Sequence, residues 1–298
     1  MEYYLSKCGR AERGHTPIRS FTSSNSHLSR SGCMADLTPA SLAALGASPP
    51  LSTAKIATAV RAGRSPVVLV SCGSFSPPTL LHLRIFEDAR DAIGAEGGAY
   101  EAVGGFMSPV HAAYGKASLA PMHDRLNMAR RSLADSSWVG ADEWECCQEG
   151  WTRTAEVLER FRQELAAVAV RVGDAEPVAG LVRVMLLCGG DLLETFAAKR
   201  PDGRPVWAEA DQQTILSRNG VVCLERAGTD LGAVVAKHGI LSSNQDNIVV
   251  VRMAAENTIS STLVRKTLAA GRSAKYLCAD ACLDYIAANK LEELEHWQ

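Results

Sequence analysis

The sequence predicts an α/β protein in which helices cover both faces of a parallel sheet. From Val67 onwards, short apolar runs typical of buried strands alternate with segments of helical period, and modest loops join them. The first run, Val67–Val70, is apolar throughout and mostly β-branched, as expected of a strand buried on both faces. The most hydrophobic run, Val182–Cys188, predicts a second central strand. This alternation is typical of a doubly wound sheet.

The other predicted elements continue the alternation. Further strands are expected at Tyr100–Met107, Trp138–Ala141, Val221–Leu224 and Ile248–Val251. Helices are expected over residues 52–62, 79–93, 121–134, 152–168, 192–196 and 260–289.

Length and composition exclude some classes of protein. The 298 residues can bury a sizeable core, and 47% hydrophobic with 21% charged residues is ordinary for a globular protein. The net charge of −2 provides no general basic field, so neither nucleic acid nor a membrane is an expected partner. No apolar run approaches the roughly 18 residues of a membrane span. Any anion must therefore bind through local features.

The nine cysteines are scattered, without a CxxC pair or a metal-ligand spacing. A reducing compartment, cytoplasmic or nuclear, is the simplest expectation, and no protein-held metal site is predicted. Residues 1–50 differ from the rest because they are rich in Ser and Arg up to Met34 and lack an apolar period. They are expected to be a disordered extension, or residues 1–34 an organelle-targeting sequence. The predicted catalytic domain is residues 51–298.

The most informative stretch runs from Ser65 to Arg90. Its strand ends in a turn with Gly73 and two consecutive prolines, which cannot continue a strand ladder. A helical period begins after Thr79. A glycine turn between a buried strand and a helix N-terminus can direct backbone N–H groups at an anion. Because His82 lies three residues after Thr79, about one turn, both side chains are expected to point toward that anion.

The residues that begin at Gly73 follow the pattern G-S-F-x-P-x-T-x-x-H-L-R. This pattern resembles the nucleotide-binding signature of the nucleotidylyltransferase superfamily, in the form found in eukaryotic nicotinamide-nucleotide adenylyltransferases. The resemblance implies a Rossmann-like sheet of the nucleotidylyltransferase type. It also implies that Gly73, Ser74 and Phe75 line the nucleotides and that His82 donates a hydrogen bond in the α-phosphate region. The usual pattern has Asn where this chain has Ser76, and a second departure is Asp124, which stands where the family often has His.

A second motif lies near the other end of the chain. Ser260, Ser261 and Thr262 come just before an apolar helical period and are expected to cap a helix. Arg265 lies one turn beyond Ser261, so its guanidinium is aimed at whatever the capping residues hold. Several donors and a cation at one helix N-terminus suit a triphosphate. The segment also resembles the I-S-S-T-x-x-R motif that closes the ATP site in the same family.

Segments between the two motifs also match the family. Asp142 begins the pattern D-x-W-E-x-x-Q-x-x-W-x-x-T. There the resemblance assigns Trp151 and Thr154 to the pyridine nucleotide, and an indole face can stack on a cationic pyridinium ring. Tyr114 and Lys116, after the second strand, are expected to approach the nucleotides, with Lys116 contacting phosphate.

Two further segments complete the predicted site. Residues 186–196 are similar to the family's L-L-C-G-x-D-L-L-x-x-F, where Gly189 lets a ligand approach the carboxyl end of the sheet. Asp191 is expected to accept ribose hydroxyls or to hold Mg²⁺ through water. Trp207, with Val206 before it, resembles the family's second ring-contacting tryptophan.

The resemblance implies transfer of AMP from ATP to nicotinamide or nicotinic acid mononucleotide, which forms NAD or deamido-NAD and pyrophosphate. Mg²⁺ is expected as a substrate-bound ion that bridges the ATP phosphates, and a homo-oligomer is left open. The residues expected to act in the reaction are His82, Lys116 and Arg265. The expected ATP-binding residues are Gly73, Ser74, Phe75, His82, Lys116, Gly189, Asp191, Ser260, Ser261, Thr262 and Arg265. The expected mononucleotide-binding residues are Ser74, Phe75, Tyr114, Trp151, Thr154, Asp191, Val206, Trp207 and Asn257.

Two alternatives stay open from the sequence. The chain could transfer a nucleotide to a different phosphate acceptor, although paired Trp151 and Trp207 suit a pyridinium ring better. It could also be a nucleotide-binding, chaperone-like protein without catalysis, against which the intact set of His82, Lys116 and Arg265 argues.

Overall fold

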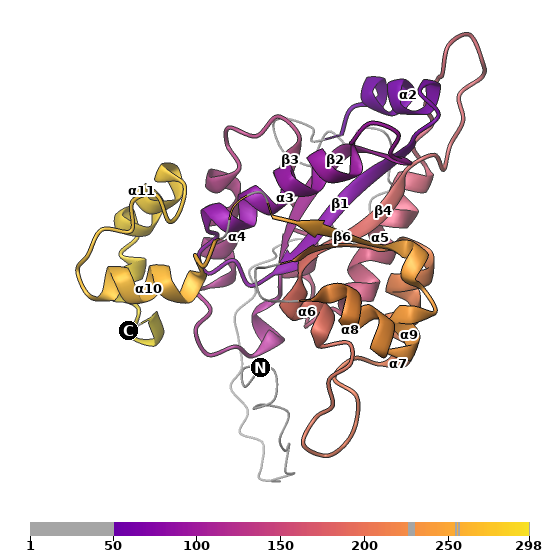
Figure 1. Ribbon diagram of the computed structural model, residues 1–298. Coiled ribbons are helices and arrows are strands. Elements are labelled where there is room, and N and C mark those ends of the chain that lie inside the picture. The colour runs from indigo at the N-terminus through magenta and orange to yellow at the C-terminus, as the bar shows by residue number, and fades with distance from the viewer. Residues whose placement is uncertain (1–50, 226–229, 254, 256, 298) are drawn as a thin grey trace, which may run out of the picture.

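A single parallel sheet organises the computed structural model, which describes residues 51–225, 230–253, 255 and 257–297 (Figure 1). The strand order is β3-β2-β1-β4-β5-β6, and every neighbouring pair is parallel. The strands are β1 (Ser65–Gly73), β2 (Tyr100–Pro109), β3 (Val139–Ala141), β4 (Arg183–Gly189), β5 (Val221–Glu225) and β6 (Ile248–Arg252). The predicted doubly wound α/β fold is confirmed. Residues 1–50, expected to form an extension, lie outside the described residues.

Helices connect the strands. Those labelled α are α2 (Thr53–Arg61), α3 (Leu80–Ile93), α4 (Met122–Ser132), α5 (Thr154–Ala166), α6 (Gly190–Glu194), α7 (Glu209–Gln213), α8 (Leu231–Lys237), α9 (Gly239–Ser242), α10 (Ser261–Ala269) and α11 (Asp280–Ala288). Short 3₁₀ turns cover Ala112–Tyr114, Glu145–Cys147, Gln245–Asn247, Leu291–Glu293 and Glu295–Trp297, and a π-helical turn covers Thr214–Asn219.

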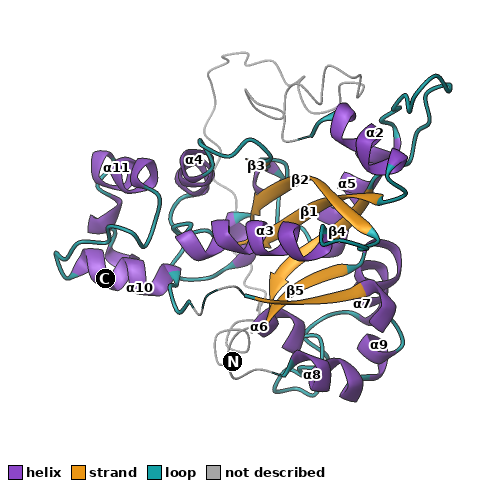
Figure 2. Ribbon diagram, turned by 45° about the horizontal axis from the view of Figure 1, so that its top comes forward, coloured by secondary structure: helices purple, strands orange, loops and turns teal. Residues whose placement is uncertain are grey.

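Both faces of the sheet are buried, and β1 shows why its sequence is apolar throughout. Val68 and Val70 face the cluster that includes α2 and α5, while Val67 and Leu69 face the cluster that includes α3. All four side chains are fully buried. Figure 2 shows α3 lying across one face of the sheet. The lack of alternation in Val67–Val70 therefore reflects burial from both sides.

The order of the strands creates the place for a ligand. The chain begins in the middle of the sheet at β1, runs outward to β3, and returns to the other side of β1 with β4. The connections that follow β1 and β4 therefore diverge at the carboxyl ends of these neighbouring strands. This topological switch point is where open α/β sheets bind ligands.

The end of the chain departs from the sequence prediction of one helical segment over 260–289. Two helices, α10 and α11, are separated by a loop in which Gly271 has φ +65° and Tyr276 has φ +64°. Both values lie in the left-handed region, and Gly271, directly after the C-cap Ala270, ends α10. The two helices pack against α4 around Met128, Val264 and Cys282 in a small third core. A second, smaller difference is that α6 begins two residues before the predicted start at 192.

Candidate active site

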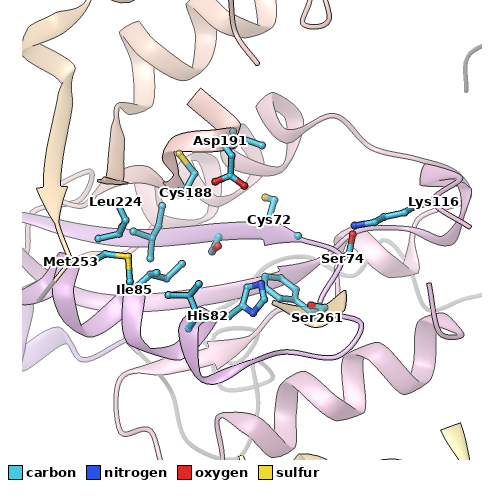
Figure 3. Close-up of a pocket in the computed structure, with 17 residues that line it drawn as sticks. Cys72, Ser74, His82, Ile85, Lys116, Cys188, Asp191, Leu224, Met253 and Ser261 are labelled. Atoms are coloured by element: carbon cyan, nitrogen blue, oxygen red, sulfur yellow. The ribbon is translucent and has the colours of Figure 1, made fainter. Parts of the chain in front are cut away.

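A cavity of about 290 Å³ lies at the carboxyl ends of β1 and β4 (Figure 3). Many of the predicted site residues line it. Those from the first motif are Gly73, Ser74, Phe75 and His82. Those from other segments are Lys116, Gly189, Asp191 and Ser261. The cavity thus brings together residues from the first β-strand, the middle of the chain and α10.

The loop after β1 is held in an unusual conformation by its own aromatic ring. Phe75 has φ +44°, in the left-handed region that only glycine adopts without cost, and its side chain is 2% exposed. Its ring folds back over Gly73, where an added Cβ would come within 3.0 Å of Phe75 Cζ. The same ring meets the imidazole of His82 edge-on, with the two centroids 5.3 Å apart. Gly73 is therefore required for close packing against Phe75.

The first turn of α3 fixes the orientation and tautomer of His82. Thr79 is the N-cap of this helix, and its backbone N–H donates to His82 Nδ1 at 3.0 Å. Thr79 Oγ1 lies 2.8 Å from the same nitrogen. Because Nδ1 accepts a hydrogen bond from a backbone N–H, the ring proton is on Nε2. His82 thus offers an N–H donor at the cavity, as the spacing from Thr79 predicts.

Helix α10 is bound directly to the loop after β1. Arg265 Nη1 donates to the carbonyl of Ser76 at 2.7 Å, across 189 residues of sequence, and Ser261 Oγ donates to the carbonyl of Pro77 at 2.8 Å. Arg265 is 6% exposed, and its Nη2 donates to Thr262 Oγ1 at 3.2 Å. The two distant motifs therefore meet at one site.

The N-terminus of α10 is capped by a hydroxyl, as its sequence predicts. Ser260 is the N-cap, and its Oγ accepts from the backbone N–H of Leu263 at 3.2 Å. The N-terminal end of the helix macrodipole carries a partial positive charge. This end of α10 includes Ser261, which lines the cavity.

Two cations are close neighbours here. The pKa of Lys116 is lowered, first by burial and then by the positive charge of Arg265. In Figure 3 the amine of Lys116 points toward Ser74. Like charges repel, so a pair of cations beside a cavity favours binding of an anion that relieves the repulsion.

A buried arginine that the sequence analysis did not single out braces the loop. Arg125, fully buried on α4, donates from Nη1 to the carbonyl of Ser74 at 3.1 Å and from Nη2 to that of Val110 at 2.6 Å. Its Nε donates to the carbonyl of Ala120 at 3.1 Å. The side chain thus connects the loops after β1 and β2. No local pattern signals this role, because all three acceptors are backbone atoms.

The predicted ring-binding residues lie outside the lining of this cavity. Trp151 is 52% exposed, and its ring centroid lies 6.5 Å from that of Tyr114. Trp207 packs on Phe196 with centroids 4.7 Å apart, and its Nε1 donates to Thr195 Oγ1 at 2.8 Å.

An ion pair connects the segments that carry these two tryptophans. Arg153 Nη1 and Asp211 Oδ1, which are 3.2 Å apart, join the residue before α5 to α7. Thr154 is the first residue of α5, and Val206 is half-buried before Trp207. Asn257 Oδ1 accepts from the backbone N–H of Ile259 at 2.8 Å.

Two buried carboxyl groups lie behind the cavity. Ser108 Oγ donates to Glu145 Oε2 at 2.6 Å, and burial raises the pKa of Glu145 to about 7. Burial likewise raises the pKa of Asp142 to about 6, although Arg160 donates to both of its oxygens. Cys72 lines the cavity, and burial together with the nearby Glu145 raises the pKa of its thiol. Cys72 is therefore a poor nucleophile, and the site does not resemble that of a thiol enzyme.

The two sequence departures have different surroundings. Ser76 directly follows Phe75 in the loop after β1 and is 1% exposed. Asp124, where the family often has His, is buried and accepts from Tyr285 Oη at 2.8 Å, which joins α4 to α11. Asp124 does not line the cavity.

Comparison with known proteins identifies the class of protein. A family profile described as cytidylyltransferase-like matches residues 70–267. The chain is 39% identical over 245 residues to the nicotinamide/nicotinic acid mononucleotide adenylyltransferase of Oryza sativa subsp. japonica, covering 81% of this chain and 93% of that protein. It is 34% identical over 260 residues to nicotinamide/nicotinic acid mononucleotide adenylyltransferase 1 of Bos taurus, covering 78% of this chain and 90% of that protein.

The corresponding yeast protein shows the same similarity over a smaller share of its length. Nicotinamide/nicotinic acid mononucleotide adenylyltransferase 1 of Saccharomyces cerevisiae is 40% identical over 231 residues, which are 76% of this chain and 55% of the yeast protein. The chain thus spans about half the length of this relative. It belongs to the family of nicotinamide/nicotinic acid mononucleotide adenylyltransferases.

The helices of the described ranges include none that is both long enough and apolar enough to cross a membrane.

The buried carboxyl of Glu145 predicts a pH-dependent stability. Its pKa rises from 4.5 to about 7 in the folded protein, so the folded state holds the proton more tightly and stability falls as pH rises through this window. The full rise corresponds to roughly 3 kcal/mol. Urea unfolding from pH 5 to 8 should show a smaller loss of stability in Glu145→Gln than in wild type. Glu143→Gln, which changes a side chain that is 54% exposed, is the control and should follow wild type. Equal pH slopes in Glu145→Gln and wild type would contradict the assignment.

Proposed function

We propose that the protein transfers AMP from ATP to nicotinamide or nicotinic acid mononucleotide and releases pyrophosphate. The observation that carries the proposal is the meeting of the two motifs at one cavity, with His82, Lys116 and Ser261 on its walls and Arg265 bound to the adjoining loop. The relatives that bear this activity in their names match the chain over most of its length. The catalytic unit that we propose is residues 51–298.

The proposed reaction needs positioning and charge neutralisation more than a base. An oxygen of the mononucleotide's 5′-phosphate attacks the α-phosphorus of ATP, a new P–O bond forms, and the bond to the bridging oxygen of the β-phosphate breaks. The attacking oxygen is already anionic, so it needs no proton removed. Catalysis then consists of holding the two phosphates in line and stabilising the charge of the departing pyrophosphate.

Each cationic or donor group of the site has a role in this scheme. His82 donates from Nε2 to the α-phosphate, in the tautomer that Thr79 fixes. Lys116 adds positive charge beside it. Arg265 and the helix N-terminus at Ser260–Thr262 hold the β- and γ-phosphates. The loop residues Gly73, Ser74 and Phe75 line the nucleotides.

The mononucleotide is proposed to extend from the cavity toward the aromatic residues. The half-exposed ring of Trp151 offers a flat surface for the pyridine ring. Tyr114, whose ring lies beside that of Trp151, and Trp207 are proposed to contact the same substrate. The further residues assigned to this substrate are Ser74, Phe75, Thr154, Asp191, Val206 and Asn257. At Gly189, an added Cβ would lie 2.8 Å from Asp191 Oδ1, so glycine leaves room for this carboxylate beside the ligand.

The carboxylate of Asp191 also fits a substrate-bound Mg²⁺. It is the one acidic side chain lining the cavity among the described residues, and those residues contain no cluster of three or more metal-ligating side chains. One carboxylate, with phosphate oxygens and water as the other ligands, is a donor set that Mg²⁺ accepts. When bound, the ion would neutralise charge on the phosphates. Asp191 would hold it, directly or through water.

The most direct test of the function is product mass. The protein should be incubated with ATP, Mg²⁺ and, in separate reactions, nicotinamide mononucleotide, nicotinic acid mononucleotide, phosphopantetheine and choline phosphate. Masses of NAD or deamido-NAD, with one pyrophosphate for each, are expected only with the pyridine mononucleotides. Product from another acceptor alone would favour a different nucleotidyl transfer, and no product from any acceptor would contradict the proposal.

His82→Ala should lower kcat by roughly 100-fold or more, because removal of one pre-placed donor to a developing charge has effects of this size. The coupled formation of dinucleotide is the measurement, and circular dichroism checks the fold. His123→Ala, which removes a histidine that is 72% exposed on α4, is the matched control and should keep wild-type kcat. Wild-type turnover in His82→Ala would refute the assignment.

Trp151→Ala should raise the KM of the mononucleotide about fivefold and leave the KM of ATP within about twofold, since loss of cation–π stacking costs near 1 kcal/mol. Tyr276→Ala removes another exposed ring, 75% accessible and outside the cavity lining, and serves as the control. An effect of Trp151→Ala on ATP alone would show that the ring does not bind the mononucleotide.

A further inference from the structure

Ser76 connects three segments that the proposed reaction needs. Its Oγ donates to the carbonyl of Ser118 at 3.2 Å and accepts from the backbone N–H of Ala120 at 2.9 Å. Its own carbonyl accepts from Arg265 at 2.7 Å. Ser76 directly follows Phe75 in the loop after β1 and is 1% exposed. We propose that Ser76 is a positioning residue whose hydroxyl holds the loop carrying Lys116 in register with α10, so that both cations meet the same triphosphate.

The loop that carries Lys116 depends on such an anchor. It runs from Gly115, which has φ +76°, to the start of α4, and the side chains of Ala117 and Pro121 in it are exposed to solvent. Within it, the backbone N–H of Leu119 donates to the carbonyl of Lys116 at 3.2 Å. The two bonds to Ser76 reach the loop two and four residues after the lysine. Ser76 therefore helps to fix the side of the loop that follows Lys116, together with Arg125, whose Nε donates to the carbonyl of Ala120.

A lysine in particular benefits from a fixed backbone. Its ammonium is a point charge on a flexible four-carbon stem, so the side chain alone specifies its position poorly. An electrostatic contribution to catalysis requires the charge to be in place before the reaction begins. The effect of Arg265 on the pKa of Lys116 indicates that the two charges are held near each other before any ligand binds.

A single hydroxyl suits this junction because one oxygen can donate and accept at once. The usual family pattern has Asn at this position. In this chain the shorter Ser76 bridges a carbonyl and an N–H of the same loop with one buried atom. Loss of that atom would leave the buried N–H of Ala120 without its acceptor, which favours movement of the loop toward water.

The inference rests on the proposed function for its kinetic consequence, but its structural part is measurable without catalysis. In the ligand-free full-length protein, the pH profile of Lys116 acetylation by acetic anhydride, followed by peptide mass spectrometry, gives the pKa of this amine. In Ser76→Ala, a released loop would separate Lys116 from Arg265 and expose it to water. The midpoint pH of Lys116 acetylation should then shift upward, toward the midpoint of an ordinary lysine.

Ser118→Ala is a matched control, because the backbone carbonyl of Ser118 accepts the hydrogen bond from Ser76 Oγ. The Oγ of Ser118, in contrast, is buried and has no hydrogen-bond partner among the described residues. This variant removes one oxygen from the loop and leaves both bonds to Ser76 intact. It should keep the wild-type labelling midpoint and wild-type kinetics.

With ATP and mononucleotide, Ser76→Ala should lower kcat/KM for ATP about tenfold, the loss expected from about 1.4 kcal/mol of positioning, with the KM of mononucleotide nearly unchanged. Ser76→Cys keeps the side-chain shape and a weak acceptor, so it is used if Ser76→Ala does not fold, and it should shift the midpoint in the same direction by less. An unshifted midpoint in the folded variant, or an equal shift in Ser118→Ala, would overturn the proposal. If the wild-type protein made no dinucleotide, the proposed function would fail, and the labelling result would still decide the role of Ser76.

Discussion

The site depends on hydrogen bonds from α10 to the backbone of the loop after β1. Arg265 and Ser261 donate to the carbonyls of Ser76 and Pro77, so a helix near the end of the chain becomes part of the wall that begins at the first strand. A buried guanidinium must be hydrogen-bonded to be tolerated. Two of the donors of Arg265 are satisfied by a carbonyl and a hydroxyl oxygen, neither of which carries a full negative charge. Arg125 follows the same rule, with three backbone carbonyls as acceptors.

These contacts help to bring two cations, Lys116 and Arg265, to one site in a chain whose net charge is −2. Lys116 lines the cavity and Arg265 acts on its pKa, whereas the buried acids Glu145 and Asp142 are not among the lining residues. Burial raises the pKa of Glu145 to about 7, so much of it is uncharged near neutral pH. An uncharged carboxyl weakens the positive field less than a carboxylate would.

Sequence patterns predicted the elements that depend on local chemistry. All six strands, the start of α3 at Thr79 and the cap of α10 at Ser260 were predicted, because buried strands and helix starts have short-range signals. The meeting of the two motifs was predicted from the family resemblance. The sequence around Arg265 contains no signal that its guanidinium donates to the carbonyl of Ser76. The break between α10 and α11 was missed although Gly271, which follows the C-cap of α10 with a left-handed backbone, is a local signal for the end of a helix. Arg125 was missed because its acceptors are backbone atoms, which every residue carries.

A crystal structure of the protein with a non-hydrolysable ATP analogue and Mg²⁺ would test whether the two motifs bind one ligand. We expect a triphosphate that spans the cavity, with its α-phosphate at hydrogen-bond distance from His82 Nε2 and its β- and γ-phosphates at the N-terminus of α10. Lys116 should contact the same triphosphate. A triphosphate bound away from α10, with Arg265 contacting no phosphate and only the β1 loop engaged, would contradict the central claim that two distant segments bind one ligand.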